Sequence, residues 1–292
     1  MSRSILALAL ALAGCEPEAP MEDLFSFAVL ADPHLYGDAD NEARWQVAVD
    51  WVNAHAAEER IELVLIVGDI AWGAGLAEAP AQLGALQPAW VPITGDNEIN
   101  GGDEQAFYEA MAPQWEALAA TLEGFQRAPA PVHNPLAGQD SWFTNLAFEL
   151  RGLRFVGLDF CARGADGLFA EMADLHDVEG GTLPWLTASL GPTDAPEDSL
   201  VLFSHHPMHL SPGSFDLAEM ETLETQLAPW EGPLFANFAG HYHENGDTGP
   251  ESGLWQVYVT DATKDDEITV RLVRVSGDGA RFAYAQELVV AG

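Results

Sequence analysis

The chain has 292 residues, of which 48% are hydrophobic, so it can bury a sizeable core in one large domain or two small ones. It has 11 Lys and Arg against 46 Asp and Glu, which gives a formal net charge of −35. A surface this acidic repels the phosphate backbone of nucleic acids and attracts cations. We therefore expect no nucleic-acid partner and look for metal sites.

The first 14 residues have the features of a secretory signal peptide. The stretch MSRSILALALALAGC has a basic start at Arg3, a short apolar run and a small residue before Cys15. That run is too short for a permanent membrane-spanning helix. Its last four residues, LAGC, resemble the lipobox of bacterial lipoproteins, which implies cleavage before Cys15 and acylation of that residue. A plain signal peptide followed by a chance cysteine is the alternative.

The lipobox resemblance predicts an exported protein held in the cell envelope by the lipid on Cys15, at the periplasmic face or the outer membrane. Residues 15–23 would be the acylated cysteine and a flexible tether, and residues 24–292 one domain. Only Cys161 remains after Cys15, so we expect no disulfide within the domain. The sequence after the N-terminus contains no further stretch that is long and apolar enough to cross a membrane.

Apolar runs alternate with helical patterns in the first part of the domain. Two runs, 25–32 and 61–69, predict strands buried on both faces, and 89–96 predicts a third strand. Apolar residues at helical spacing predict a helix over 41–59, capped by Asp40 or Asn41, and an Ala-rich helical stretch before the third strand. A further helix is predicted over 103–124, with a break near Pro113. This alternation predicts a parallel sheet with right-handed crossovers.

The second part of the chain is richer in strands. In chain order we expect a hairpin over 141–150 and 153–160, a helix over 182–190, a strand over 199–206, a helix over 216–227 and a strand over 233–243. The last three apolar runs, 254–262, 267–275 and 281–289, predict an antiparallel meander. The predicted fold class is therefore α/β: a single domain of two stacked mixed β-sheets flanked by helices, a four-layer αββα sandwich.

Five short motifs fall where predicted strands end. They are DPH at 32–34, GD at 68–69, GDNE at 95–98, HHP at 205–207 and GHYH at 240–243. Loops at the carboxyl ends of parallel strands converge on one crevice, and these loops carry carboxylate and imidazole groups that suit Mn, Fe or Zn. The candidate ligands are Asp32, His34, Asp69, Asp96, His205, His241 and His243. Seven are too many for one tetrahedral zinc ion and suit two ions about 3.5–4 Å apart that share a carboxylate.

These residues also have structural interpretations. Asp32 and Asp69 could cap helices, and His34 could be an interior histidine with satisfied hydrogen bonds. His205 and His206 are adjacent, so only one can point to a given side of a strand, and the spacing to the following proline selects His205. His209 follows closely enough that it could also line the site.

The ordered motifs resemble those of the calcineurin-like metallophosphoesterase superfamily, D-x-H, G-D, G-N-H-(D/E), H-x-P and G-H-x-H. The match runs from Asp32 to His243. The resemblance implies two metal ions bridged by Asp69. It implies that Asp32, His34 and His243 bind the first ion. It implies that Asp96, His205 and His241 bind the second.

The GDNE motif departs from the family pattern. Anchoring on Gly95 places Asp96 where the family has an asparagine ligand, and Asn97 where it has a histidine that assists the leaving group. A slip of one residue would make Asn97 the ligand, but it would misplace Glu98. An amide donates hydrogen bonds and cannot transfer a proton near neutral pH. The general acid is therefore missing, and the extra carboxylate makes the metal centre neutral and suits a trivalent iron.

Three functions remain open. The first is an envelope-anchored phosphoesterase with two transition-metal ions, in which a bridging hydroxide attacks a small phosphorylated substrate, a mono- or diester. Asn97 would then steady the phosphoryl oxygens, and His209 or water would assist the leaving group. The second is a degenerate lipoprotein that binds metal without catalysis. The third is a metal-dependent hydrolase of non-phosphate esters, because a fold does not determine a function.

Overall fold

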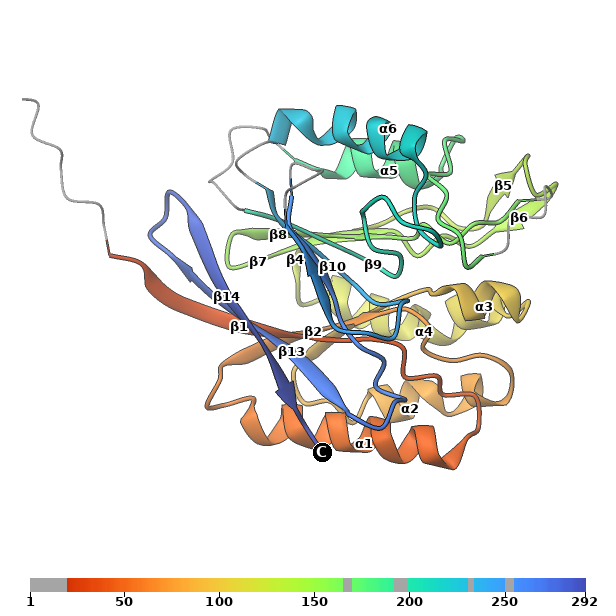
Figure 1. The fold of residues 1–292 in the computed structure, drawn as a ribbon. Helices are drawn as coiled ribbons and strands as arrows, with labels where there is room; N and C mark the ends of the chain where they lie inside the picture. Colours follow the sequence, from red (N-terminus) through yellow and green to blue (C-terminus); the bar gives the residue numbers. More distant parts are fainter. Residues whose placement is uncertain (1–19, 165–169, 192–198, 231–233, 250–254) are drawn as a thin grey trace, which may run out of the picture.

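The computed structural model describes residues 20–164, 170–191, 199–230, 234–249 and 255–292. Two large sheets stack against each other, with helices on both outer sides (Figure 1). The first sheet contains, in spatial order, β14 (Phe282–Val290), β13 (Thr269–Gly277), β1 (Glu22–Leu30), β2 (Ile61–Val67) and β3 (Ala89–Ile93). The second contains β11 (Gly246–Thr248), β12 (Val257–Val259), β10 (Leu234–Ala239), β9 (Leu200–Ser204), β8 (Leu153–Leu158), β7 (Leu146–Leu150) and β4 (Glu123–Arg127). A separate ribbon pairs β5 (Val132–Asn134) with β6 (Gln139–Ser141).

Two pairs of helices cover the outer faces of the stacked sheets, and a third pair lies at one side (Figure 1). In chain order they are α1 (Ala39–His55), α2 (Ala79–Leu83), α3 (Asp96–Asn100), α4 (Glu104–Ala119), α5 (Thr182–Ser189) and α6 (Leu217–Leu227), with short 3-10 helices at Gly73–Ala77 and Ala228–Trp230. Helices α1 and α2 lie beside the first sheet, and α5 and α6 lie on the far side of the second (Figure 1). Helices α3 and α4 lie at one side, where α4 contacts the edge strands β3 and β4 (Figure 1). This arrangement confirms the predicted αββα sandwich in one domain.

The main core lies between the two sheets. The fully buried ring of Phe27 on β1 packs edge-on against Phe155 on β8 and Phe238 on β10, with centroids 5.5 and 5.2 Å apart. A second apolar cluster joins the outer face of the second sheet to α5 and α6, through Leu186 and Leu223 among others. Burying one such side chain contributes roughly 1.5–3 kcal/mol, so these two layers hold the sheets and helices together.

The first sheet has the predicted parallel order, since β1, β2 and β3 pair in parallel. The predicted hairpin is also confirmed: β7 and β8 pair antiparallel through Arg151 and Gly152, both with positive φ. Two local predictions were wrong. The cap of α1 is Asp38, whose side chain accepts the backbone N–H groups of Asp40 and Asn41. Helix α4 continues through Pro113, which is exposed, so the carbonyl that loses its partner can face water.

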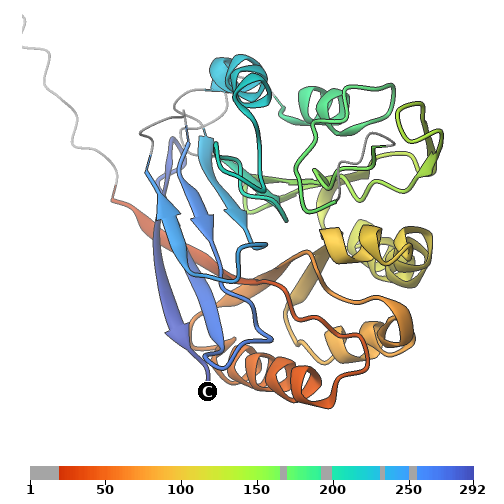
Figure 2. The ribbon, with the colours of Figure 1, turned by 45° about the vertical axis from the view of Figure 1, so that its right-hand side comes forward.

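The predicted C-terminal meander was wrong in one strand. β12 lies in the second sheet, parallel to β10, whereas β13 and β14 form an antiparallel pair at the edge of the first sheet, where β13 also pairs with β1. The chain therefore crosses between sheets after β12, and its C-terminus ends beside α1 (Figure 2).

The N-terminal predictions are largely outside the described residues. The expected signal peptide, Cys15 and the start of the tether fall there, and β1 begins at Glu22, two residues before the expected domain boundary. Of the helices that the structure describes, none has both the length and the apolar character needed to span a bilayer.

Candidate metal centre

The five motifs lie at the carboxyl ends of five strands, three from the first sheet and two from the second. β1, β2 and β3 run parallel, as do β9 and β10, so each group of loops leaves its sheet at one edge. The loops after β1 and β2 stay together beyond the strands, because His34 donates its backbone N–H to Asp69 O at 3.0 Å and Leu35 donates to Ile70 O at 2.8 Å. The two sheets thus bring all seven candidate ligands to one place.

Three motif glycines make this convergence possible. A Cβ on Gly68 would lie 2.5 Å from a ring nitrogen of His205. A Cβ on Gly95 would lie 2.0 Å from the backbone nitrogen of Asp69, and one on Gly240 would lie 2.4 Å from Asp32 Oδ2. Side chains at these positions would push the loops apart, so the glycines are required by close approach.

The backbone at the centre is strained. Five of its side-chain donors come from residues with positive φ: Asp32, His34, Asp69, His241 and His243. A non-glycine residue in this region costs on the order of 1–3 kcal/mol, and such residues concentrate at functional sites. The fold holds these residues in an unfavourable conformation in order to direct their side chains inward.

The first group of side chains consists of Asp32, His34, Asp69 and His243, whose donor atoms all lie within 4.8 Å of one another. His34 Nε2 lies 3.3 Å from Asp69 Oδ2, and His243 Nε2 lies 3.4 Å from Asp32 Oδ1. Asp32 Oδ1 and His34 Nε2 are buried without a hydrogen-bond partner. A buried polar atom left unpaired is costly, so these two atoms are arranged for a ligand.

The second group consists of Asp69, Asp96 and His205, which makes Asp69 common to both groups. His205 Nε2 lies 2.7 Å from Asp96 Oδ1, and His241 Nδ1 lies 3.1 Å from the same oxygen. The opposite ring nitrogens of both histidines face backbone carbonyls, Val67 O at 2.9 Å for His205 and Gly213 O at 3.0 Å for His241. Metal-binding histidines are usually oriented by such an outer hydrogen bond.

The charges within the cluster are strongly coupled. Burial disfavours ionised Asp96, but hydrogen bonds from His205 and His241 outweigh it and lower the pKa of Asp96. Burial likewise disfavours a charged His205, yet the Asp69 and Asp96 carboxylates raise its pKa well above the usual value. A proton on His205 thus compensates the charge of the buried carboxylates beside it.

His206 also belongs to the cluster, although the sequence analysis set it aside. One nitrogen of its fully buried ring lies within 4.8 Å of donor atoms on Asp96 and His241. The alternation rule that excluded His206 applies within a strand, and β9 ends at Ser204 before either histidine. The only sequence signal for His206 was its place next to His205 in the HHP motif. The chain bends after the strand, so both rings reach the centre.

Asn97 faces the shared carboxylate. Its backbone N–H donates to Asp69 Oδ1 at 2.8 Å, and its side-chain amide donates to Asp69 Oδ2. His209 is not among the clustered groups of the described residues; its ring lies beside Tyr242, 5.8 Å between centroids. Burial lowers the pKa of His209.

Two buried networks hold the loops and were not predicted from the sequence. Glu98 accepts the backbone N–H groups of Ala71 and Gly95, each at 2.7 Å, and so ties the second motif loop to the third; burial raises its pKa to about 8. Arg163 bonds Glu104 at 2.6 Å and Asp159 at 2.7 Å. Glu98 is the last residue of the GDNE motif, and this was the only feature of the sequence that pointed to its hydrogen bonds with the two loops.

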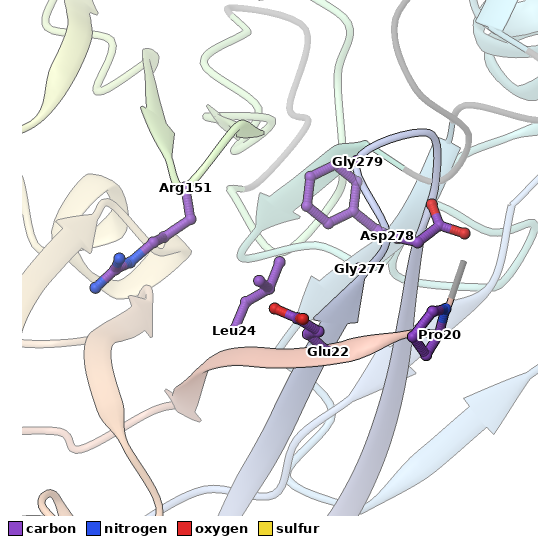
Figure 3. A pocket seen from close by; sticks show the side chains of 8 residues that line it. Pro20, Glu22, Leu24, Arg151, Gly277, Asp278 and Gly279 are labelled. Carbon is purple, nitrogen blue, oxygen red and sulfur yellow. The ribbon is translucent and has the colours of Figure 1, made fainter.

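Two cavities among the described residues are lined by none of these ligands. One, of about 420 Å³, lies at the amino end of β1, between Pro20, Glu22 and the β13–β14 turn (Figure 3). Arg151 borders it but is directed away, and its guanidinium pairs with Glu62. The other, of about 400 Å³, lies between Met172 and the segment 210–217.

The donor set fits two cations. Donor atoms within 4.8 Å of one another suit ions bound at about 2.0–2.3 Å, and the shared Asp69 suits a bridge between them. Asp32 Oδ1 and His34 Nε2, the two buried atoms without a hydrogen-bond partner, would then have a cation as their partner. Imidazole and carboxylate donors without thiolates favour Mn, Fe or Zn over softer metals.

Comparisons with known proteins agree with this geometry. The calcineurin-like phosphoesterase profile matches residues 25–245. GAP50, the anchor in the inner membrane complex of Plasmodium, is similar in structure with a TM-score of 0.55 and 13% identity, over 92% of this chain and 85% of that chain.

A putative 5'-nucleotidase from Staphylococcus aureus, solved in complex with alpha-ketoglutarate, is also similar, with a TM-score of 0.53 and 13% identity. This match covers 91% of the present chain and only 54% of that chain. At such identity both likenesses show the fold alone, and no curated protein matches the sequence. The profile match spans most of the chain and every motif at the centre. The chain belongs to the calcineurin-like phosphoesterase family.

Proposed function

We propose that this protein is a dinuclear metal-dependent phosphoesterase that hydrolyses phosphate mono- or diesters. The observation that carries the proposal is the shared Asp69, which lies in both groups of candidate ligands. Asp32, His34 and His243 would hold one ion with it, and Asp96, His205 and His241 the other. His206 is placed to complete the second set.

Two bound ions would activate a water molecule for attack on phosphorus and polarise the phosphoryl oxygens. The chain's own groups orient this chemistry. Val67 O and Gly213 O fix the rings of His205 and His241. Asn97 holds Asp69 through two hydrogen bonds, and its amide lies beside the reacting centre as a donor that can neither give nor take a proton.

The first experiment is elemental analysis of protein purified without chelators, followed by a screen of phosphomonoesters and diesters with Mn, Fe or Zn. We expect about two ions per chain. Asp69→Asn should lose at least one ion and abolish hydrolysis, because an amide bridges two cations poorly. Asp50→Asn, on the exposed face of α1, is the matched control.

Two results would contradict the proposal. If the wild-type protein is metal-free and stays inactive after Mn, Fe or Zn is added, the protein is not a metal-dependent phosphoesterase. Protein that holds two ions but cleaves no ester would favour the degenerate metal-binding alternative, and cleavage of carboxylic esters alone would favour the non-phosphate hydrolase.

We also propose that the protein is exported and anchored in the cell envelope by a lipid on Cys15. The support is the LAGC sequence, which resembles a lipobox. The native protein should partition into detergent, and Cys15→Ser should move it to the aqueous phase. Labelling with radioactive palmitate provides the direct measurement, and Cys161→Ser is the control. A native protein that retains its initiator methionine would exclude the anchor.

A further inference from the structure

A series of stacked and edge-on rings leads from the metal centre to the surface. His243 and His34 have centroids 5.1 Å apart, and His34 meets Trp72 edge-on at 5.0 Å. Trp72 in turn stacks on Tyr36, with centroids 5.1 Å and planes 24° apart. We call Trp72 and Tyr36 the aromatic platform. It starts in contact with a candidate metal ligand and ends at Tyr36, a residue that is 41% exposed.

The platform lies on the side of the centre that carries Asn97. Trp72 follows β2 and packs beside the end of α3, since a Cβ on Gly101 would lie 3.5 Å from Trp72 Cβ. Helix α3 begins at Asp96 and contains Asn97, which donates to Asp69. A substrate bound at the metals can therefore extend along Asn97 toward Trp72.

The backbone under Tyr36 is rigid. Leu35, the preceding residue, is buried and donates its N–H to Ile70 O at 2.8 Å. Gly75 packs so closely on this segment that a Cβ there would lie 1.6 Å from Leu35 O. Tyr36 also donates its N–H to His34 O at 3.0 Å. The exposed ring is held in place before any ligand binds, which lowers the entropic cost of stacking on it.

Exposure distinguishes the platform from ordinary packing. Tyr36 is the only aromatic among the markedly exposed large hydrophobic side chains of the described residues. A stacked pair with one exposed face beside a reaction centre presents a surface for another flat ring.

We propose that the aromatic platform is a stacking subsite for a flat aromatic ring on the alcohol part of the substrate, so that the enzyme prefers aryl or nucleoside phosphate esters. This inference rests on the proposed phosphoesterase function and specifies its substrate class. For aryl esters it also agrees with the chemistry of Asn97, because an aryl oxide departs more easily than an alkoxide without a proton donor; a nucleoside phosphate, whose leaving group is an alkoxide, draws its support from ring stacking alone.

The test compares Tyr36→Leu with Tyr36→Phe on the metal-loaded protein. The substrates are 4-nitrophenyl phosphate, adenosine monophosphate and glycerol phosphate. Tyr36→Leu should raise KM for the ring-bearing esters, relative to glycerol phosphate, by about 5- to 150-fold, the range expected for the loss of one aromatic stacking partner. Tyr36→Phe should keep the wild-type ratio. A larger effect with the nucleotide identifies a nucleobase as the bound ring, and a larger effect with the nitrophenyl ester identifies a simple aryl group.

Binding without turnover separates this proposal from the proposed function. Phenylphosphonate and methylphosphonate are not hydrolysed, and their dissociation constants can be measured by calorimetry even if the protein proves inactive. The wild type should bind the phenyl compound more tightly, and Tyr36→Leu should remove the difference. Tyr284→Leu, at a half-buried tyrosine on β14 that bonds Tyr258, controls for the loss of a tyrosine outside the platform. Equal binding of both phosphonates by the wild type, or the same ratio of KM values in Tyr36→Leu, would overturn the subsite.

Discussion

At the residue scale, Asn97 takes, in the proposed phosphoesterase, the position where the family's motif pattern has a histidine. Its side-chain amide and backbone N–H both donate to Asp69, so it orients the shared carboxylate. The position can hold a hydrogen bond but supplies no proton for a departing alkoxide. In the proposed phosphoesterase, the leaving group would therefore have to be good, or its proton would have to come from water.

Replacing Asn97 with His should speed hydrolysis of alkyl esters more than hydrolysis of aryl esters. General acid assistance is worth about 10²- to 10⁴-fold, and it matters most for basic leaving oxygens. The measurement is kcat/KM for one ester of each kind, with metal content checked in both proteins. If Asn97→His lowers both rates equally with its metals intact, Asn97 serves to position Asp69 or substrate, and the account of the missing acid fails.

Gly95 shows how closely the motif loops approach. Gly95→Ala would place a Cβ 2.0 Å from the backbone nitrogen of Asp69, and backbone atoms would have to shift. Overpacking of this kind lowers the free energy of unfolding by about 1–3 kcal/mol, and here it would also displace Asp69, the shared ligand. We expect a lower melting temperature and the loss of bound metal, measured by calorimetry and elemental analysis. Gly249→Ala, where a Cβ would meet nothing within 4 Å, should change neither. Full metal occupancy in Gly95→Ala would show that the loops tolerate separation.

At the element scale, a buried ion-pair network connects α4 to the loop after β8. Arg163 contacts Glu104 at the start of α4 and Asp159 just beyond β8, and all three side chains are buried or nearly so. Asp159 also accepts the backbone N–H of Thr144, and Thr144 Oγ1 accepts the backbone N–H of Thr94 in the third motif loop. The network therefore supports the segment that presents Asp96.

Arg163→Met should destabilise the protein by about 3–5 kcal/mol, because it leaves two buried carboxylates without a cation. Urea unfolding measures the change. Arg274→Met is the control, since Arg274 pairs with Glu59 and Glu287 at the surface, where such pairs contribute about 0–1 kcal/mol. Adding Asp159→Asn and Glu104→Gln to Arg163→Met should recover part of the loss. Equal effects of the two single substitutions would show that the buried network is no stronger than a surface pair.

At the scale of the whole molecule, charge and metal binding are linked. The chain carries a formal charge of −35, and three of its carboxylates, Asp32, Asp69 and Asp96, are buried in one cluster. Bound cations would offset the repulsion among these carboxylates. They would bind only the folded state, because the unfolded chain does not bring the ligands together. Metal should therefore contribute to the stability of the entire domain, through loops drawn from both sheets.

A chelator should lower the melting temperature, and added Mn, Fe or Zn should restore it. A ligand at 100 times its dissociation constant stabilises the folded state by about 2.7 kcal/mol. Scanning calorimetry with and without chelator measures the shift, and its size should depend on the concentration of added metal. A melting temperature that changes neither with chelator nor with added metal would show that the cluster binds no ion under those conditions.

The sequence by itself determined the chemistry of the centre and the order of most elements. Apolar runs predicted β1, β2, β3, β9 and β10, and the polar motifs at their ends predicted a shared crevice. These features are local: a strand's burial pattern and the donor type at its end can both be read within a few residues. The hairpin of β7 and β8 was predictable for the same reason.

Only the tertiary structure decided features that depend on distant partners. β12 and β13 read alike as short apolar strands, yet they pair in different sheets, because pairing depends on which edge is free after the rest of the chain has folded. His206 joined the centre because the chain bends once β9 has ended, where strand alternation no longer applies. Trp72 and Tyr36 follow different strands, and their stacking beside His34 results from the parallel alignment of β1 and β2, which no local pattern records.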